Sequence, residues 1–170
     1  NILQGRGKYS TELAQELVHW TEVTMLETLS GTKVKEHFID GALPCLQELR
    51  AHGASLACAT GNLKSIANQI LYGTELKRFF PVLAAYTPET PQRYQIVAKA
   101  RRELEQETGR TFWKTYVIGD SPSDIRAAKQ VEGIAVGVAT GHYSTEELAK
   151  EGPDILLQNQ VGQYPALKGQ

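Results

Sequence analysis

Short apolar runs alternate with amphipathic stretches along most of the chain, and this alternation indicates a parallel α/β sheet. Small or polar residues connect each apolar run to the helical pattern that follows it. The predicted strands are Leu56–Thr60, Val82–Tyr86, Thr115–Gly119, Ile134–Ala139 and Asp154–Leu157. The predicted helices among them are Leu63–Tyr72, Pro91–Glu107, Pro122–Val131 and Thr145–Glu151.

The N-terminal part has a different pattern, which is helical without strands. Leu13, Leu17 and Trp20 lie on one helical stripe. We expect residues 1–38 to form part of a small helical accessory domain. The α/β core is expected to span residues 39–170, and a helix over Pro44–His52 leads into its first predicted strand.

Local signals mark the ends of several helices. Thr90-Pro91 predicts a helix start, and Gly109 follows the end of the same helix. Ser144 and Glu147 have the spacing of a capping box.

Composition narrows the functional classes. The 170 residues include 18 Lys and Arg and 19 Asp and Glu, so no charge excess suggests binding to nucleic acid or to an acidic membrane. The apolar runs are too short for a membrane helix. Cys45 and Cys58 form neither a CxxC motif nor a disulfide framework, so we expect a reducing, cytoplasmic location.

The turn Gly119–Asp124 is the most informative feature of the sequence. It follows an apolar strand, so Asp120 is expected at the rim of the sheet and Asp124 in the first turn of the next helix. Carboxylates are the ligands that Mg²⁺ prefers, so both are candidate metal ligands. An ordinary helix start explains Ser121, Pro122 and Asp124 equally well, but it gives Asp120 no role.

Two further strand ends carry polar residues. Thr60-Gly61-Asn62 combines a hydroxyl with backbone amides at a helix start, which suits an anion, although a simple Thr or Asn cap would have the same sequence. Arg93 falls in the first turn of its predicted helix, where a cation opposes the helix dipole. Either Glu89 or a bound phosphoryl group would satisfy it.

Together the three turns predict a Mg²⁺-assisted phosphoryl-transfer site, because the carboxyl ends of parallel strands lie at one edge of a sheet. A hydroxyl with amides, a cation and a pair of carboxylates would meet there. This order of signals resembles the haloacid dehalogenase-like (HAD) superfamily, particularly its phosphoglycolate-phosphatase-like members. Thr60-Gly61-Asn62 is similar to the second motif of that family, Arg93 stands where the third has Lys or Arg, and Gly119-Asp120 with Asp124 is similar to the fourth.

The resemblance covers roughly residues 40–160 and implies a Rossmann-like, three-layer α/β core with part of a helical cap at residues 1–38. It also implies a hydrolase that acts on a small phosphorylated metabolite through an aspartyl-phosphate, as a monomer or homodimer. In that scheme Thr60, Gly61, Asn62 and Arg93 bind the phosphoryl group, with Thr60 and Arg93 catalytic. Asp120 and Asp124 are the residues of the metal site, with Mg²⁺ as cofactor.

The nucleophile of this scheme is absent from the sequence. The family carries it in an Asp-x-Asp motif on its first strand, and no Asp-x-Asp occurs here. The chain starts at Asn1, and losing a central strand would leave unpaired backbone at about 1–3 kcal/mol per buried group. We therefore expect a fragment rather than a non-catalytic relative.

The sequence is also compatible with two other functions. A 2-haloacid dehalogenase would use an aspartate nucleophile on the same fold without a metal. A non-catalytic relative would only bind a phosphorylated ligand or a partner.

Overall fold

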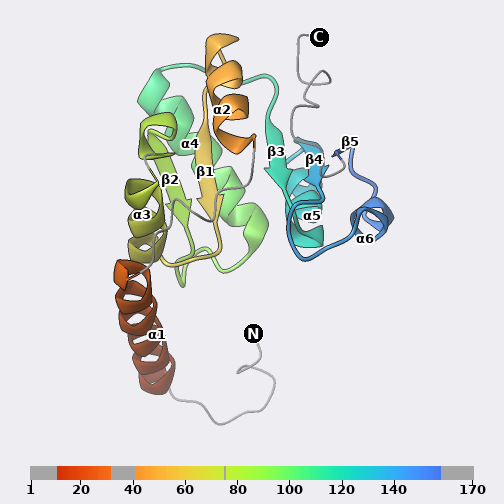
Figure 1. Cartoon of the computed structure of the whole chain (residues 1–170). Coiled ribbons are helices and arrows are strands. Elements are labelled where there is room, and N and C mark those ends of the chain that lie inside the picture. The colour runs from red at the N-terminus through yellow and green to blue at the C-terminus, as the bar shows by residue number, and fades with distance from the viewer. Residues whose placement is uncertain (1–10, 32–40, 75, 158–170) are drawn as a thin grey trace.

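The computed structural model describes residues 11–31, 41–74 and 76–157. Their helices and strands alternate as the sequence predicts, and most ends lie within one or two residues of the prediction (Figure 1). The helices are α1 (Thr11–Gly31), α2 (Ala42–Ala51), α3 (Lys64–Gly73), the short 3-10 helix η3 (Leu76–Phe79), α4 (Arg93–Thr108), α5 (Pro122–Gln130) and α6 (Thr145–Lys150). The strands are β1 (Ala57–Thr60), β2 (Val82–Ala85), β3 (Tyr116–Gly119), β4 (Ile134–Val138) and β5 (Ile155–Leu157).

The strands form two separate parallel sheets. One has the order β1-β2, with Ala57 opposite Val82, and the other has the order β3-β4-β5. Among the described residues, β1 pairs only with β2, and β3 is bonded only to β4. Figure 1 shows β1 and β3 as the facing strands of the two sheets, both running in the same direction. Each therefore has an edge without a partner strand.

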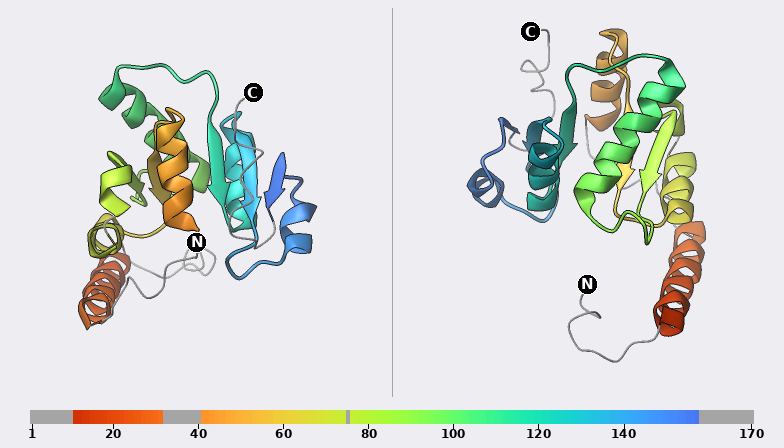
Figure 2. Two further views of the ribbon diagram at one scale, coloured as in Figure 1. Left: turned by 45° about the horizontal axis from the view of Figure 1, so that its top comes forward. Right: turned by 180° about the vertical axis from the view of Figure 1, so that it is seen from behind.

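Helix α4 connects the two sheets. It packs against β1 and β2 on one side and against α5 on the other, and the view from behind shows it lying across the first sheet (Figure 2). Ile96 and Ala100 of α4 form a buried cluster with Ala84 of β2. Helix α5 in turn packs against β3 and β4, so α4 and α5 together link the two sheets.

A second buried cluster holds the three-stranded half together. Ile125 and Ala128 of α5, Ala135 of β4 and Leu148 of α6 are almost fully buried. The helical spacing of apolar residues explains this cluster, because it places them on the side of each helix that faces the sheet.

Most of the predicted helix ends are confirmed. Ser144 accepts a hydrogen bond from the backbone of Glu147, whose carboxylate accepts one in return from the Ser144 amide. Gly109 ends α4 in the left-handed conformation, with φ of 64°. These ends depend on neighbours within four residues, so sequence patterns can identify them.

The predicted cap of α4 is wrong. Thr90 is bonded to Thr87 in a tight turn, and the helix begins after Gln92 instead. The Gln92 amide donates to the side chain of Gln95 at 3.0 Å, which supplies the cap. Arg93 is then the first residue of the helix, so it still lies in the first turn, as predicted.

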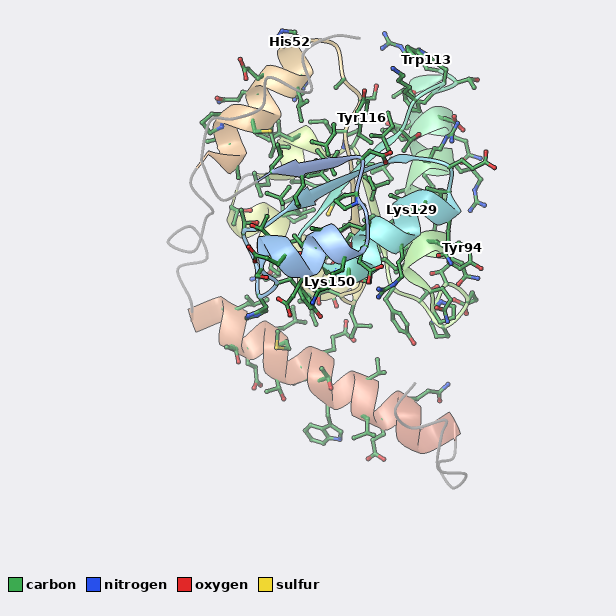
Figure 3. The ribbon with its side chains drawn as sticks, turned by 90° about the vertical axis from the view of Figure 1, so that its right-hand side faces the viewer. His52, Tyr94, Trp113, Tyr116, Lys129 and Lys150 are labelled. Atoms are coloured by element: carbon green, nitrogen blue, oxygen red, sulfur yellow. The ribbon has the colours of Figure 1, made fainter. Side chains whose placement is uncertain are left out.

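Helix α1 stands beside the α/β core and contacts it through α3 (Figure 3). The hydroxyl of Ser65 donates to the carboxylate of Glu22, which ties the two helices together. Trp20 is 61% exposed. The predicted boundary between residues 38 and 39 lies outside the described residues. None of the described helices could cross a membrane.

Replacing Leu148 with Ala should lower the free energy of unfolding by about 2–5 kcal/mol, because the side chain is fully buried and its loss leaves a cavity. The same change at Leu17, which is 44% exposed, should cost less than about 0.5 kcal/mol. Urea denaturation of both variants tests this, and equal losses would contradict the packing described.

Candidate functional site

The site lies where β1 and β3 end and α4 begins. Thr60 and Gly119 are the last residues of β1 and β3, and Arg93 is the first residue of α4. The two strands point the same way (Figure 1), so the turns that follow them lie on the same side of the molecule.

Arg93 joins the predicted turns. Its Nε donates to Oδ1 of Asp124 over 2.7 Å, in an ion pair whose side chains are 30% and 5% exposed. On the other side of the guanidinium, Nη1 of Arg93 lies 3.6 Å from the position that a Cβ at Gly61 would take. The structure therefore brings together Gly61, Arg93 and Asp124, from three turns far apart in the sequence.

Asp124 uses both carboxylate oxygens within the protein. While Oδ1 binds Arg93, Oδ2 accepts a hydrogen bond of 2.7 Å from the Ser121 hydroxyl and one of 3.2 Å from the Ser121 amide. Asp124 thus supplies the helix start that the sequence predicts, and it also binds Arg93 from a second turn. A carboxylate this buried needs such partners, since an unpaired buried charge is strongly unfavourable.

The turn after β1 is not an ordinary helix cap. The N-cap of α3 is Leu63, and no side chain caps the helix. The Thr60 hydroxyl accepts the Asn62 amide at 3.1 Å, and the Asn62 carbonyl accepts the Tyr86 amide at 3.2 Å. The Asn62 amide, which the sequence suggested as an anion donor, is therefore already bonded, whereas the Thr60 hydroxyl donates to no residue that the structure describes.

Asp120 differs from Asp124 in its exposure and in its hydrogen bonding. It is exposed, and it makes no hydrogen bond or ion pair with any residue that the structure describes. Its carboxylate packs directly against the backbone of Gly141, in the loop after β4: a Cβ at Gly141 would lie 2.0 Å from Oδ2 of Asp120. No described contact links Asp120 to Arg93. Asp120 is thus a free carboxylate at the end of β3.

In the part of the chain that the structure describes, the turn offers Mg²⁺ one free carboxylate, that of Asp120. Within the described ranges, no group of three or more His, Cys, Asp or Glu side chains could enclose a metal ion. Mg²⁺ is commonly held by one or two carboxylates together with water and substrate phosphate. Asp120 has the free oxygens for direct ligation, while Asp124 is committed to Arg93 and Ser121.

Two residues near the site escaped the sequence analysis. Cys58 shares a face of β1 with Thr60, two residues on, and strand periodicity could have indicated this. Burial raises the pKa of the Cys58 thiol, while the positive charges of Arg93 and Lys77 act in the opposite direction. Gly141 was given no role in the site either, although Thr140-Gly141 follows a strand as Thr60-Gly61 does.

Comparison with known proteins identifies related sequences. The family model described as haloacid dehalogenase-like hydrolase matches residues 6–139. A phosphoglycolate phosphatase from Synechococcus elongatus is 31% identical over 121 residues, which is 69% of this chain and 53% of that protein. A probable phosphatase, IndB, from Dickeya dadantii is 27% identical over 121 residues, 69% of this chain and 50% of that protein. The chain thus spans about half the length of the curated relatives it matches.

Solved structures share the fold. A putative phosphatase from Clostridium difficile aligns with a TM-score of 0.68 at 20% identity, over 89% of this chain and 69% of that one. A hydrolase from Pseudomonas syringae aligns with a TM-score of 0.66 at 21% identity, over 91% and 71%. These likenesses confirm the predicted α/β core with parallel strands.

Replacing Arg93 with Gln should raise the pKa of Cys58 further, because a positive charge that favours the thiolate is removed. At a fixed alkaline pH the thiol should then react more slowly with iodoacetamide, and the midpoint of its pH–rate curve should move upward. Mass spectrometry resolves Cys58 from Cys45. The matched control is Arg102→Gln on the same helix, and a midpoint that does not move in Arg93→Gln would contradict the described electrostatics.

Proposed function

The chain belongs to the haloacid dehalogenase-like hydrolase family, and from this we propose that it forms most of the catalytic core of a Mg²⁺-dependent phosphatase acting on a small phosphorylated metabolite. The observation that supports this most directly is the position of Arg93. One guanidinium lies between the turn after β1 and the buried Asp124 at the start of α5.

Arg93 is suited to grip a phosphoryl group. Its Nε is bound to Asp124, which orients the guanidinium, and its two terminal nitrogens make no hydrogen bond with the described residues. Those nitrogens can donate to two phosphoryl oxygens, which is the arrangement that a planar guanidinium favours. The Thr60 hydroxyl, with the backbone of Gly61 beside Arg93, provides the further donors.

Asp120 is the proposed direct ligand of Mg²⁺, and Asp124 supports the site by holding Arg93. A bound Mg²⁺ would supply neutralisation of the charge that develops on the phosphoryl oxygens. Asp120 is free to take this role because no described residue already occupies its carboxylate.

The nucleophile is proposed to come from an extended segment outside this sequence, seated between β1 and β3. Within the described ranges both strands have a free edge there, and they run in the same direction. Tyr116 and Ile118, on one face of β3, are 40% and 46% exposed, and Tyr116 is labelled in Figure 3. A parallel strand in this position would end beside Thr60 and Asp120 and would bring an aspartate to the Arg93 side of the sheet.

The proposed reaction has two steps. A carboxylate oxygen of that aspartate attacks phosphorus, the bond from phosphorus to the leaving oxygen breaks, and a neighbouring acid protonates the leaving alcohol. Water then attacks the phosphorus of the aspartyl-phosphate and gives its proton to the same acid, releasing inorganic phosphate and the free carboxylate. Arg93 and Thr60 stabilise the phosphoryl oxygens in both steps.

Asp120→Asn in the full-length gene product should lower the turnover of p-nitrophenyl phosphate with Mg²⁺ by about 100-fold or more, because the cation that would neutralise charge on the phosphoryl oxygens loses its carboxylate ligand. The matched control is Glu107→Gln, an exposed acid near the far end of α4. Unchanged activity in Asp120→Asn would remove this residue from the metal site.

The same preparation tests the dehalogenase alternative. EDTA should abolish phosphatase turnover, and 2-chloropropionate should release no chloride. Chloride release that persists in EDTA would overturn the phosphatase proposal in favour of a metal-independent dehalogenase.

The proposed central strand predicts slow amide exchange at the two free edges. In the full-length gene product, peptides that contain β1 and β3 should exchange deuterium as slowly as peptides that contain β2 and β4, since their amides would all be bonded within one sheet. Rapid exchange confined to β1 and β3, measured by mass spectrometry, would show that no strand occupies the position between them.

A further inference from the structure

We propose that Gly141 is a positioning residue for Asp120: by having no side chain, it leaves the space that the metal-binding carboxylate occupies. This inference rests on the proposed phosphatase function, because it concerns the same metal site. It adds the loop after β4 to the turns that build the site.

The contact between the two residues is unusually close. A Cβ at Gly141 would lie 2.0 Å from Oδ2, 2.8 Å from Cγ and 3.2 Å from Cβ of Asp120. The first two distances are far shorter than non-bonded atoms tolerate. Any side chain at position 141 therefore requires the Asp120 carboxylate to lie elsewhere.

The Asp120 side chain is the part that can move. The clash is most severe at the end of the side chain, and Asp120 is exposed and unbonded among the described residues. Gly141 is also not among the described glycines with positive φ, so its backbone accepts Ala without strain. A rotation of Asp120 about χ1 would move Oδ2 and Cγ away, leaving only the 3.2 Å contact with the Asp120 Cβ, which needs a small shift. We therefore expect the fold to be preserved.

A side chain at Gly119 would also clash with an aspartate, but with one that cannot move. A Cβ there would lie 2.4 Å from Cβ, Cγ and Oδ2 of Asp124. Asp124 is buried, is bonded through both oxygens and belongs to α5, so its side chain has no alternative position. Gly119→Ala should therefore destabilise the fold, whereas Gly141→Ala should change the position of a single carboxylate.

The displaced carboxylate is expected to weaken metal binding specifically. Mn²⁺ prefers the same oxygen ligands as Mg²⁺ and can be followed by electron paramagnetic resonance. In the full-length gene product, Gly141→Ala should lower Mn²⁺ affinity at least about tenfold, since residues that orient a ligand typically contribute about 10- to 100-fold to metal affinity. The thermal unfolding midpoint should not change.

A double-substitution cycle separates positioning from a general structural effect. Asp120→Asn should itself weaken Mn²⁺ binding, and adding Gly141→Ala to it should have no further effect, because Gly141 acts only through Asp120. The control in the same loop is His142→Ala, which should bind Mn²⁺ as the unsubstituted protein does.

Three results would overturn the inference while leaving the proposed function in place: equal Mn²⁺ affinity in Gly141→Ala and the unsubstituted protein, additive losses in the double variant, or unfolding of Gly141→Ala. Absence of Mn²⁺ binding by the unsubstituted protein would overturn the metal site of the proposed function, and this inference with it.

Discussion

The ion pair between Arg93 and Asp124 is the interaction on which the arrangement of the site depends. It joins the first residue of α4 to the first turn of α5 over 2.7 Å, and those helices belong to the two halves of the molecule. The carboxylate is almost fully buried, so it needs this cation and the two hydrogen bonds from Ser121. Because the same guanidinium also lies beside Gly61, the turn after β1 and the start of α5 lie close together.

Because the strands form two separate sheets, the ion pair between Arg93 and Asp124 also helps to hold the two halves of the molecule together. The strands form a pair and a triplet with no ladder between β1 and β3 in the described part of the chain. The halves are instead joined on one face by α4, which packs on β1, β2 and α5. The two sheets are therefore held together by a helix and by an ion pair whose carboxylate is buried, and both facing strand edges are open to a further strand.

The two acids of the Gly119–Asp124 turn have opposite environments, and this separates their chemistry. Asp124 is enclosed by donors and is part of the framework, whereas Asp120 is exposed and rests against the bare backbone of Gly141. A carboxylate held by packing alone keeps its oxygens free for a ligand. The sequence placed both acids in one candidate metal site, and a helix start accounted for Asp124 but not for Asp120. The contacts that separate their environments, with Arg93 and with Gly141, come from the tertiary structure.

Local pattern was enough to predict nearly every strand and helix, because apolar periodicity and helix ends such as Ser144 with Glu147 depend on residues within a few positions of one another. It was also enough to select the three polar turns, since each follows or precedes an apolar run. The start of α4 was misplaced because Thr90 bonds to Thr87, an alternative that the helix-start pattern does not exclude. Folding in three dimensions alone decided that Arg93 meets Asp124, 31 residues away, and that Gly141 makes room for Asp120. Such contacts depend on how α4, α5 and the loop after β4 pack together. The spacing of residues along the chain does not predict this packing.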